Sequence, residues 1–154
     1  MIKIMFVCHG NICRSPMAEF LMKDLVGKEG NSDKFLIKSS ATSFEEEGNP
    51  VHYGTRKILL ERGISCEGKR ATKLFKSDYD KYDYFVCMDS YNFKNMLNIF
   101  GGDRQNKCYK LLDFTDNPRD VADPYWTGDF TKTVSDVEQG VNAFYEFLKE
   151  QNGL

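Results

Sequence analysis

Short apolar runs alternate along the chain with segments in which apolar residues recur every three or four positions. Continuous apolar runs of this length predict strands buried on both faces, and the longer spacing predicts amphipathic helices. The predicted strands cover residues 2–7, 35–37, 84–88 and 108–112. The predicted helices cover residues 15–27, 51–62, 93–100 and 134–148. Between them lie a polar loop at 44–50 and a loop rich in Asp and Pro at 113–129.

This order of elements predicts the fold. Strands that alternate with helices are joined by right-handed crossovers, which produce a parallel sheet with helices on both faces. We therefore expect an α/β fold with a doubly wound, four-stranded parallel sheet. Residues 1–154 should form a single domain, because this length suffices for one core but is short for two. Ligands of such folds bind at the carboxyl ends of the strands, where residues 8–16 follow the first strand.

Composition and charge exclude several classes of protein. Hydrophobic residues make up 41% and aromatic residues 14% of the chain, which is typical of a globular domain. The formal net charge is −2, so we expect no nucleic acid and no membrane as partner, and any anion binding must be local. Five cysteines without a Cys-x-x-Cys pair argue against a disulfide framework and against a metal site. They favour a reducing, cytoplasmic location.

The segment that carries candidate chemistry reads Cys-His-Gly-Asn-Ile-Cys-Arg-Ser-Pro, at residues 8–16. Cys8 ends a predicted strand and precedes a helix N-terminus, where aligned N–H dipoles and the Arg14 guanidinium favour the nucleophilic thiolate. Arg14 presents a planar fork that can hold two oxygens of a tetrahedral anion side by side. The alternative is a buried cysteine at a strand end and an unrelated arginine on the surface.

The remaining residues of this segment favour the site over that alternative. Gly10 and Asn11 tolerate the positive φ that a ring-like loop with inward-facing N–H groups requires. The same concavity that stabilises a thiolate binds a tetrahedral dianion. Ser15 can cap the helix that follows, and its hydroxyl is placed to donate to the sulfur of Cys8. Together these residues predict that phosphate or a similar oxyanion binds beside a nucleophilic cysteine.

The segment resembles the signature of the low-molecular-weight protein tyrosine phosphatases, in which Cys-x5-Arg-Ser lies at the extreme N-terminus. The resemblance extends to nearly the end of the chain. It includes Ser-Ala-Thr-Ser at 40–43, Gly-Asn-Pro at 48–50, Cys-Met-Asp at 87–89 and Asp-Pro-Tyr at 123–125. It implies a four-stranded parallel sheet with flanking helices. It also implies that Cys8 and Arg14 hydrolyse phosphotyrosine in proteins through a cysteinyl-phosphate intermediate, with neither a metal nor a cofactor.

The resemblance further implies that Asp123 protonates the leaving phenol and then activates water. Aryl phosphate hydrolysis needs a group in that role. From the residues alone, Asp123 is equally part of a plain Asp-Pro turn. Asp116, Asp120 and Asp129 share the same loop, so only the match to the family motif separates Asp123 from them.

Other residues around the phosphate also match the family. Tyr125 and Trp126 would line the rim and sandwich the substrate ring, although aromatic residues in a loop also serve simple packing. Ile12 accompanies phosphotyrosine activity, whereas threonine marks the related arginine phosphatases. Ser40 and Asp89 resemble residues that hold the shape of the loop, and they equally suit caps at strand ends. The residues expected to bind substrate are His9, Gly10, Asn11, Ile12, Cys13, Ser15, Tyr125 and Trp126.

Two positions depart from the family's pattern. Glu45, the first of three consecutive glutamates, stands where members often have an aromatic residue, and should change which phosphoproteins are accepted. No histidine–arginine pair occurs at 69–72, which leaves part of the outer support of the site missing. We expect His9 to face outward and tune substrate choice, and the three glutamates and the pair Lys69-Arg70 to be solvated.

Two other functions suit this scaffold. An arsenate reductase relays a disulfide through additional thiols near the third strand, but Cys87 there lacks a close second cysteine. A phosphate-binding module without turnover would not need Cys8, Arg14 and Asp123 together. Cys13 either forms a reversible disulfide with an oxidised Cys8 or simply packs beneath the loop.

Overall fold

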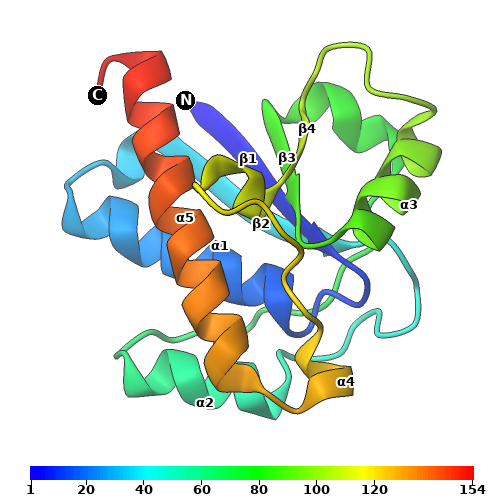
Figure 1. Cartoon of the computed structure of the whole chain (residues 1–154), viewed down its shortest axis with the longest axis vertical. Helices are drawn as coiled ribbons and strands as arrows, with labels where there is room; N and C mark the ends of the chain where they lie inside the picture. Colours follow the sequence, from blue (N-terminus) through cyan, green and yellow to red (C-terminus); the bar gives the residue numbers. More distant parts are fainter.

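Four parallel strands form the centre of the molecule in the computed structural model, which describes residues 1–154 (Figure 1). The strands are β1 (Ile2–Cys8), β2 (Phe35–Ala41), β3 (Tyr84–Cys87) and β4 (Cys108–Lys110), in the spatial order β2-β1-β3-β4. Cys8 pairs with Ala41, and Val7 pairs with Cys87, so the carboxyl ends of β1, β2 and β3 share one edge. The predicted four-stranded parallel sheet is confirmed.

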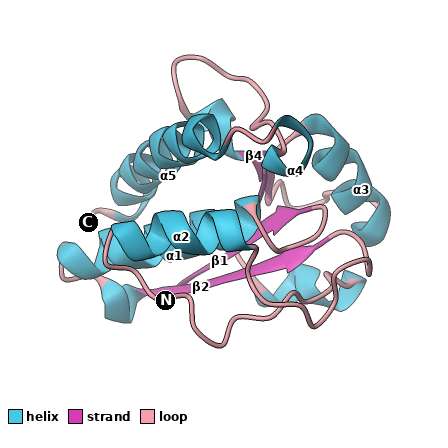
Figure 2. Ribbon diagram, turned by 90° about the horizontal axis from the view of Figure 1, so that it is seen from below, coloured by secondary structure: helices cyan, strands magenta, loops and turns pink.

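Helices cover both faces of this sheet, as predicted (Figure 2). They are α1 (Arg14–Lys28), α2 (Tyr53–Glu61), α3 (Ser90–Phe100), α4 (Pro124–Thr127) and α5 (Phe130–Asn152). Short 3₁₀ helices cover Ser32–Lys34, Lys76–Lys81 and Leu111–Phe114. The elements α1, α2 and α5 pack over one face, and α3 packs over the other. None of the helices combines the length and the apolar character needed to cross a membrane.

Alternating side chains of β1 divide the core in two. Ile4 and Phe6 face the larger cluster under α1 and α5, where the rings of Phe6 and Phe144 meet edge-on with centroids 6.1 Å apart. Met5 and Val7 face the smaller cluster under α3. Because both faces of β1 are covered, the chain that leaves its carboxyl end is accessible only at the edge of the sheet. The segment 8–16 begins there.

The starts of two helices differ from the prediction. Ser15 was expected to cap α1, but the cap position is Cys13, and no side chain bonds the free N–H groups there. Ser15 lies inside the first turn, where its hydroxyl makes other contacts. The second helix begins at Tyr53 rather than at 51, because the ring of His52 accepts a hydrogen bond from the N–H of Gly54 and caps it.

Other boundaries also differ from the prediction. The strand β2 continues past 37 to Ala41 and so includes two serines. The predicted strand 108–112 ends at Lys110, because Leu111 begins a 3₁₀ turn that packs under α5. A Cβ atom added at Gly140 of α5 would clash with the side chain of Leu111, so this contact depends on the glycine. The helix α4 within the 113–129 loop was not predicted.

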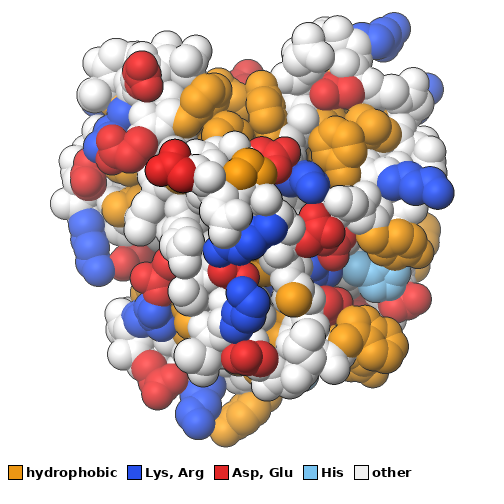
Figure 3. All heavy atoms as spheres, viewed as in Figure 1, with side chains coloured by type: hydrophobic (Ala, Val, Ile, Leu, Met, Phe, Trp, Pro, Cys, Tyr) orange, Lys and Arg blue, Asp and Glu red, His pale blue; other side chains and the backbone are white.

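Charged side chains are interspersed on the face drawn in Figure 3, where acidic and basic groups alternate rather than form a field of one sign. This distribution agrees with the formal net charge of −2. Anion binding therefore depends on the local arrangement of a few groups rather than on the charge of the whole surface.

Candidate active site

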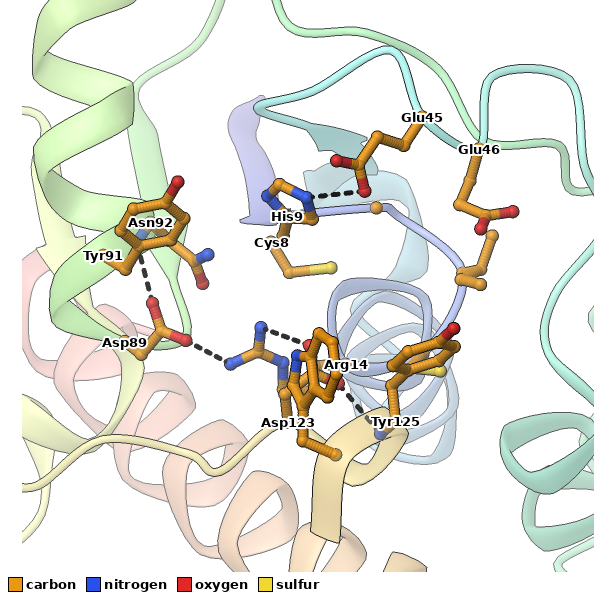
Figure 4. A pocket seen from close by; sticks show the side chains of 14 residues that line it. Cys8, His9, Arg14, Glu45, Glu46, Asp89, Tyr91, Asn92, Asp123 and Tyr125 are labelled. Carbon is orange, nitrogen blue, oxygen red and sulfur yellow. Dashed lines mark hydrogen bonds and ion pairs between the residues drawn. The ribbon is translucent and has the colours of Figure 1, made fainter. Parts of the chain in front are cut away.

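A cavity of about 550 Å³ opens at the carboxyl end of β1 (Figure 4). Its walls come from the β1–α1 loop, the loop after β2, the start of α3, and α4 with the residue before it. Most of the residues predicted for the site line it. The lining consists of Cys8, His9, Gly10, Ile12, Cys13, Arg14, Glu45, Glu46, Asp89, Tyr91, Asn92, Asp123, Tyr125 and Trp126.

The sulfur of Cys8 points into this cavity, and two groups of its own loop contact it. The hydroxyl of Ser15 lies 3.0 Å from the sulfur, and the N–H of Asn11 donates to it across 3.3 Å. Asn11 has a φ of 58°, as expected for the loop. Gly10 does not have a positive φ, so that expectation was wrong. Its missing side chain instead gives room to Glu46, whose Cγ would lie 3.3 Å from a Cβ at this position.

The side chain of Asn11 ties the loop to two neighbouring segments. Its Nδ2 donates to the Ser15 hydroxyl across 2.8 Å and to the Ser39 hydroxyl across 2.9 Å. Its Oδ1 accepts the N–H of Thr72 across 3.1 Å. Asn11 is 1% exposed, and its side-chain hydrogens are all bonded. Because Ser15 accepts from Asn11, the hydrogen of its own hydroxyl is free to point at Cys8, which agrees with the expected donor role.

A buried acid and a lysine extend this network, and neither was predicted. The Ser39 hydroxyl donates to Glu19 across 2.5 Å, and the ammonium of Lys69 donates to the Ser39 carbonyl across 2.8 Å. Lys69 was expected to be solvated, but its side chain is only 13% exposed, and burial lowers its pKa although Glu19 opposes that shift. Lys69 supports the site from the 69–72 segment. Ser40 was expected to help hold the loop, but its buried hydroxyl has no partner, and Ser39 bonds Asn11 instead.

Arg14 is buried and held by several acceptors. Its Nη1 donates to Asp89 across 2.6 Å and to the Val121 carbonyl across 2.8 Å. Burial works to lower the pKa of Arg14, but the negative charge of Cys8 and the bond to Asp89 outweigh it, so the pKa is raised. Asp89 also accepts the N–H of Asn92 and caps α3, so both roles considered for Asp89 occur together. The guanidinium therefore stands in one orientation at the floor of the cavity.

Of the five aspartates in the 113–129 loop, only Asp123 lines the cavity. One of its oxygens accepts the N–H of Tyr125 across 3.0 Å and caps α4, while the other faces Arg14. Asp120 lies elsewhere, where it accepts from Lys110 across 3.1 Å. Asp129 caps α5, and Asp116 does not reach the cavity. Of the four aspartates that were candidates for the acid, the fold therefore places only Asp123 at the cavity. In the sequence, only the family motif distinguished it from the others.

Comparison with known proteins identifies the family. The family model described as low molecular weight phosphotyrosine protein phosphatase matches residues 3–153. The chain belongs to this family. It is 35% identical to the low molecular weight protein-tyrosine-phosphatase YfkJ of Bacillus subtilis, with 100% of each chain covered. It is 39% identical to the low molecular weight protein-tyrosine-phosphatase PtpA of Staphylococcus aureus, with 100% of this chain and 98% of the relative covered.

Solved structures of relatives share the fold of this phosphatase. The crystal structure of YfkJ from Bacillus subtilis matches with a TM-score of 0.96 at 35% identity, covering 99% of this chain and 97% of that one. The low molecular weight protein tyrosine phosphatase SP-PTP from Streptococcus pyogenes matches with a TM-score of 0.86 at 39% identity. That match covers 96% of this chain and 93% of SP-PTP.

The acidic side of the phosphatase rim differs from the prediction. His9 was expected to face outward, but its ring lines the cavity, and its Nε2 lies 2.9 Å from a carboxylate oxygen of Glu45 (Figure 4). Glu45 and Glu46 were expected to be solvated. The side chain of Glu45 is 69% exposed, as expected, and that of Glu46 is partly exposed, but both also line the cavity. Glu46 is also fixed, because Asn49 donates to it across 2.7 Å. Two ordered carboxylates therefore stand at the entrance.

Three exposed aromatic residues form the rest of the phosphatase rim. Tyr125 and Trp126 are 63% and 81% exposed, and their rings meet edge-on with centroids 5.0 Å apart. Both lie where the family resemblance places them. Tyr91, on α3, also lines the cavity and is 62% exposed, and the sequence analysis did not find it. These rings offer apolar surface to an aromatic substrate.

All five cysteines of the phosphatase are buried and unpaired. Burial and the negative charges of Cys8 and Asp123 raise the pKa of Cys13 to about 12. Cys87 lies in β3 and faces the core under α3, where burial raises its pKa well above the usual value. A buried neutral thiol is a poor nucleophile, so Cys87 is unsuited to the relay of an arsenate reductase.

Proposed function

We propose that the phosphatase hydrolyses phosphotyrosine in proteins, with residues 1–154 acting as one catalytic domain. The observation that carries the proposal is the convergence of a thiol, a guanidinium and a carboxylate, from Cys8, Arg14 and Asp123, on one cavity. Ile12 supplies an apolar contact within the loop. The rings of Tyr125 and its neighbour Trp126 offer surface to the phenol of the substrate.

In the first step the Cys8 thiolate attacks phosphorus. A bond from sulfur to phosphorus forms while the bond from phosphorus to the phenolic oxygen breaks, and Asp123 gives its proton to that oxygen. Arg14 and the N–H groups of the loop hold the other phosphate oxygens as charge develops on them. Since Asp89 and the Val121 carbonyl already fix Arg14, little reorganisation is needed.

In the second step Asp123, now ionised, takes a proton from a water molecule whose oxygen attacks phosphorus. The bond from sulfur to phosphorus breaks, phosphate leaves, and the Cys8 thiolate and protonated Asp123 are restored. The Ser15 hydroxyl stabilises the departing sulfur as a hydrogen-bond donor. Arg14 and the backbone N–H groups stabilise the negative charge on the phosphate oxygens in both steps, so neither step requires a metal ion or a cofactor.

We also propose that the phosphatase works in the cytoplasm. The support is its cysteine chemistry, because five free thiols, one of them an activated nucleophile, persist best where the medium is reducing.

Trapping the intermediate tests the proposal. The enzyme is mixed with para-nitrophenyl phosphate or a phosphotyrosine peptide, quenched in acid and digested, and the peptide that contains Cys8 is weighed by mass spectrometry. We expect one added phosphoryl group on Cys8, and none in Cys8→Ser, whose turnover should fall below about 1% of wild type because a serine hydroxyl is not ionised here. Cys66→Ser is the control, since Cys66 does not line the cavity. A phosphoryl group on another residue, or undiminished turnover by Cys8→Ser, would overturn the proposal.

A further inference from the structure

A continuous chain of hydrogen bonds runs from the buried carboxylate of Glu19 to the sulfur of Cys8. The Ser39 hydroxyl lies 2.5 Å from Glu19 Oε1, and Asn11 Nδ2 lies 2.9 Å from that hydroxyl. The same nitrogen lies 2.8 Å from the Ser15 hydroxyl, which lies 3.0 Å from Cys8 Sγ. All five side chains are buried. This series of hydrogen bonds links α1, β2 and the loop at the carboxyl end of β1.

The donors and acceptors in this chain can be assigned in only one direction. A carboxylate only accepts, so the Ser39 hydroxyl gives its single hydrogen to Glu19. Ser39 therefore accepts from the amide of Asn11, whose orientation is also set because its Oδ1 accepts the N–H of Thr72. The other amide hydrogen goes to Ser15. The Ser15 hydroxyl can then donate its own hydrogen to the sulfur of Cys8. A donor in this position favours the thiolate over the thiol.

Two lysines lie beside the buried carboxyl group of Glu19. Glu19 is 3% exposed, and its Oε2 accepts from Lys23 of the same helix across 2.6 Å. Lys69 lies 3.8 Å from its Oε1 and donates to the Ser39 carbonyl across 2.8 Å, so Lys69 also positions the serine that bonds the carboxylate. Both oxygens of Glu19 therefore accept, one from Lys23 and the other from the Ser39 hydroxyl.

We propose that Glu19 is a positioning residue of the reaction, whose carboxylate orients the Ser15 hydroxyl as a donor to Cys8. Through this bond Glu19 stabilises the thiolate before attack and again when sulfur leaves. Glutamine at this position can donate as well as accept, so the hydrogen of Ser39 is no longer held by one acceptor and the support that Ser39 gives to Asn11 is weakened. The inference rests on the proposed role of Cys8 as nucleophile.

Alkylation of Cys8 by iodoacetamide tests this inference, because it measures the thiolate without any turnover of phosphate ester. The rate is measured as a function of pH, together with the melting temperature of each variant. We expect Glu19→Gln to lower the rate about three- to ten-fold at the pH where the wild-type rate is half-maximal, the size of one ordinary hydrogen bond. In a Ser15→Ala background the same substitution should change the rate by less than about two-fold, because the series of hydrogen bonds no longer reaches the sulfur.

A matched control lies on the same helix. Asp24 pairs with Lys28 across 2.9 Å, as Glu19 pairs with Lys23. Asp24 takes no part in the series of hydrogen bonds that leads to Cys8. Asp24→Asn should leave the alkylation profile unchanged.

Two results would overturn the inference: an unchanged profile in Glu19→Gln, or an equal fold-change with and without the Ser15 hydroxyl. If Glu19→Gln does not fold, Ser39→Ala breaks the next link while leaving Glu19 with its lysines. Ser39→Ala should show the same loss of rate, and an unchanged profile in that variant would also overturn the inference. Failure here is distinct from failure of the proposed function, which the trapped intermediate decides.

Discussion

Arg14 and Asp123 are 109 positions apart in the chain, yet Nη2 of the arginine lies 3.4 Å from Oδ2 of the aspartate. The bond from Arg14 to Asp89 is shorter, at 2.6 Å. Asp89 therefore holds the guanidinium in place, while the carboxyl of Asp123 is 25% exposed and faces the cavity under a weaker restraint. This difference suits a fixed anion-binding group next to an acid that must reach a leaving oxygen.

The proposed role of Asp123 as a general acid predicts a dependence on the leaving group. Asp123→Asn should slow phosphotyrosine hydrolysis by about 10²–10⁴-fold, but should slow the first step far less for an activated aryl phosphate whose phenolate leaves unaided. Single-turnover measurement of phenol release isolates that step. Asp116→Asn is the control, since Asp116 shares the loop but does not line the cavity. Equal slowing of both substrates in the first step would make Asp123 a structural residue.

The fork of Arg14 should not be replaceable by another cation. Lysine keeps the charge but loses the paired donors and the planar shape, so Arg14→Lys should lower kcat/KM by at least about 100-fold on any aryl phosphate. Steady-state kinetics and the affinity for inorganic phosphate measure the effect. Arg104→Lys, at an exposed position outside the cavity, should leave both unchanged. A loss of only a few-fold in Arg14→Lys would contradict bidentate binding.

The pKa of Cys13 predicts selective modification of the two cysteines in the loop. With its pKa raised to about 12, Cys13 remains a neutral thiol at any pH well below that value. Its thiolate appears only as the pH rises toward 12, so mild alkylation at neutral pH should label Cys8 and spare Cys13. Peptide mapping after partial reaction measures the ratio. After unfolding in urea both cysteines should react, and labelling of Cys13 first in the folded protein would contradict the prediction.

The two carboxylates at the entrance predict a preference among phosphopeptides. Glu45 and Glu46 should favour basic residues next to phosphotyrosine over acidic ones, by a few-fold for each exposed pair of charges. We expect kcat/KM to fall from lysine-flanked to alanine-flanked to aspartate-flanked peptides, and the contrast to shrink as salt is added. The double variant Glu45→Gln/Glu46→Gln should remove the contrast. Glu47→Gln, outside the cavity, should retain it, and a contrast that survives the double variant would rule out these residues as its source.

Much of the fold and the centre of the site could be predicted from local patterns. The apolar run before Cys8 predicted β1, and the loop and helix that follow it are contiguous in the chain, so their geometry follows from neighbouring residues. The positive φ of Asn11 was expected for the same reason. The helix α4 was not, because four residues show no periodicity.

The supporting residues were harder to predict because they depend on register and on distant segments. Successive residues of a strand face opposite sides, so a shift of one position exchanges Ser39 for Ser40 as the partner of Asn11. Lys69 has no apolar pattern around it, and only the pairing of Ala41 with Lys73 brings its segment against β2. The local signal for Glu19 was its spacing, because it lies four residues after Ser15 and four before Lys23 on the same helix.

The sequence by itself determined the parallel sheet and placed Cys8 and Arg14, the proposed nucleophile and anion-binding group, at its edge, because each is encoded by residues close together in the chain. Only the tertiary structure decided which of four aspartates faces Arg14, that Glu45 and Glu46 stand at the entrance, and that Glu19 is linked to Cys8. These are contacts between segments separated by tens of residues. They depend on how loops pack over the sheet edge, and side-chain spacing along the chain carries little information about that.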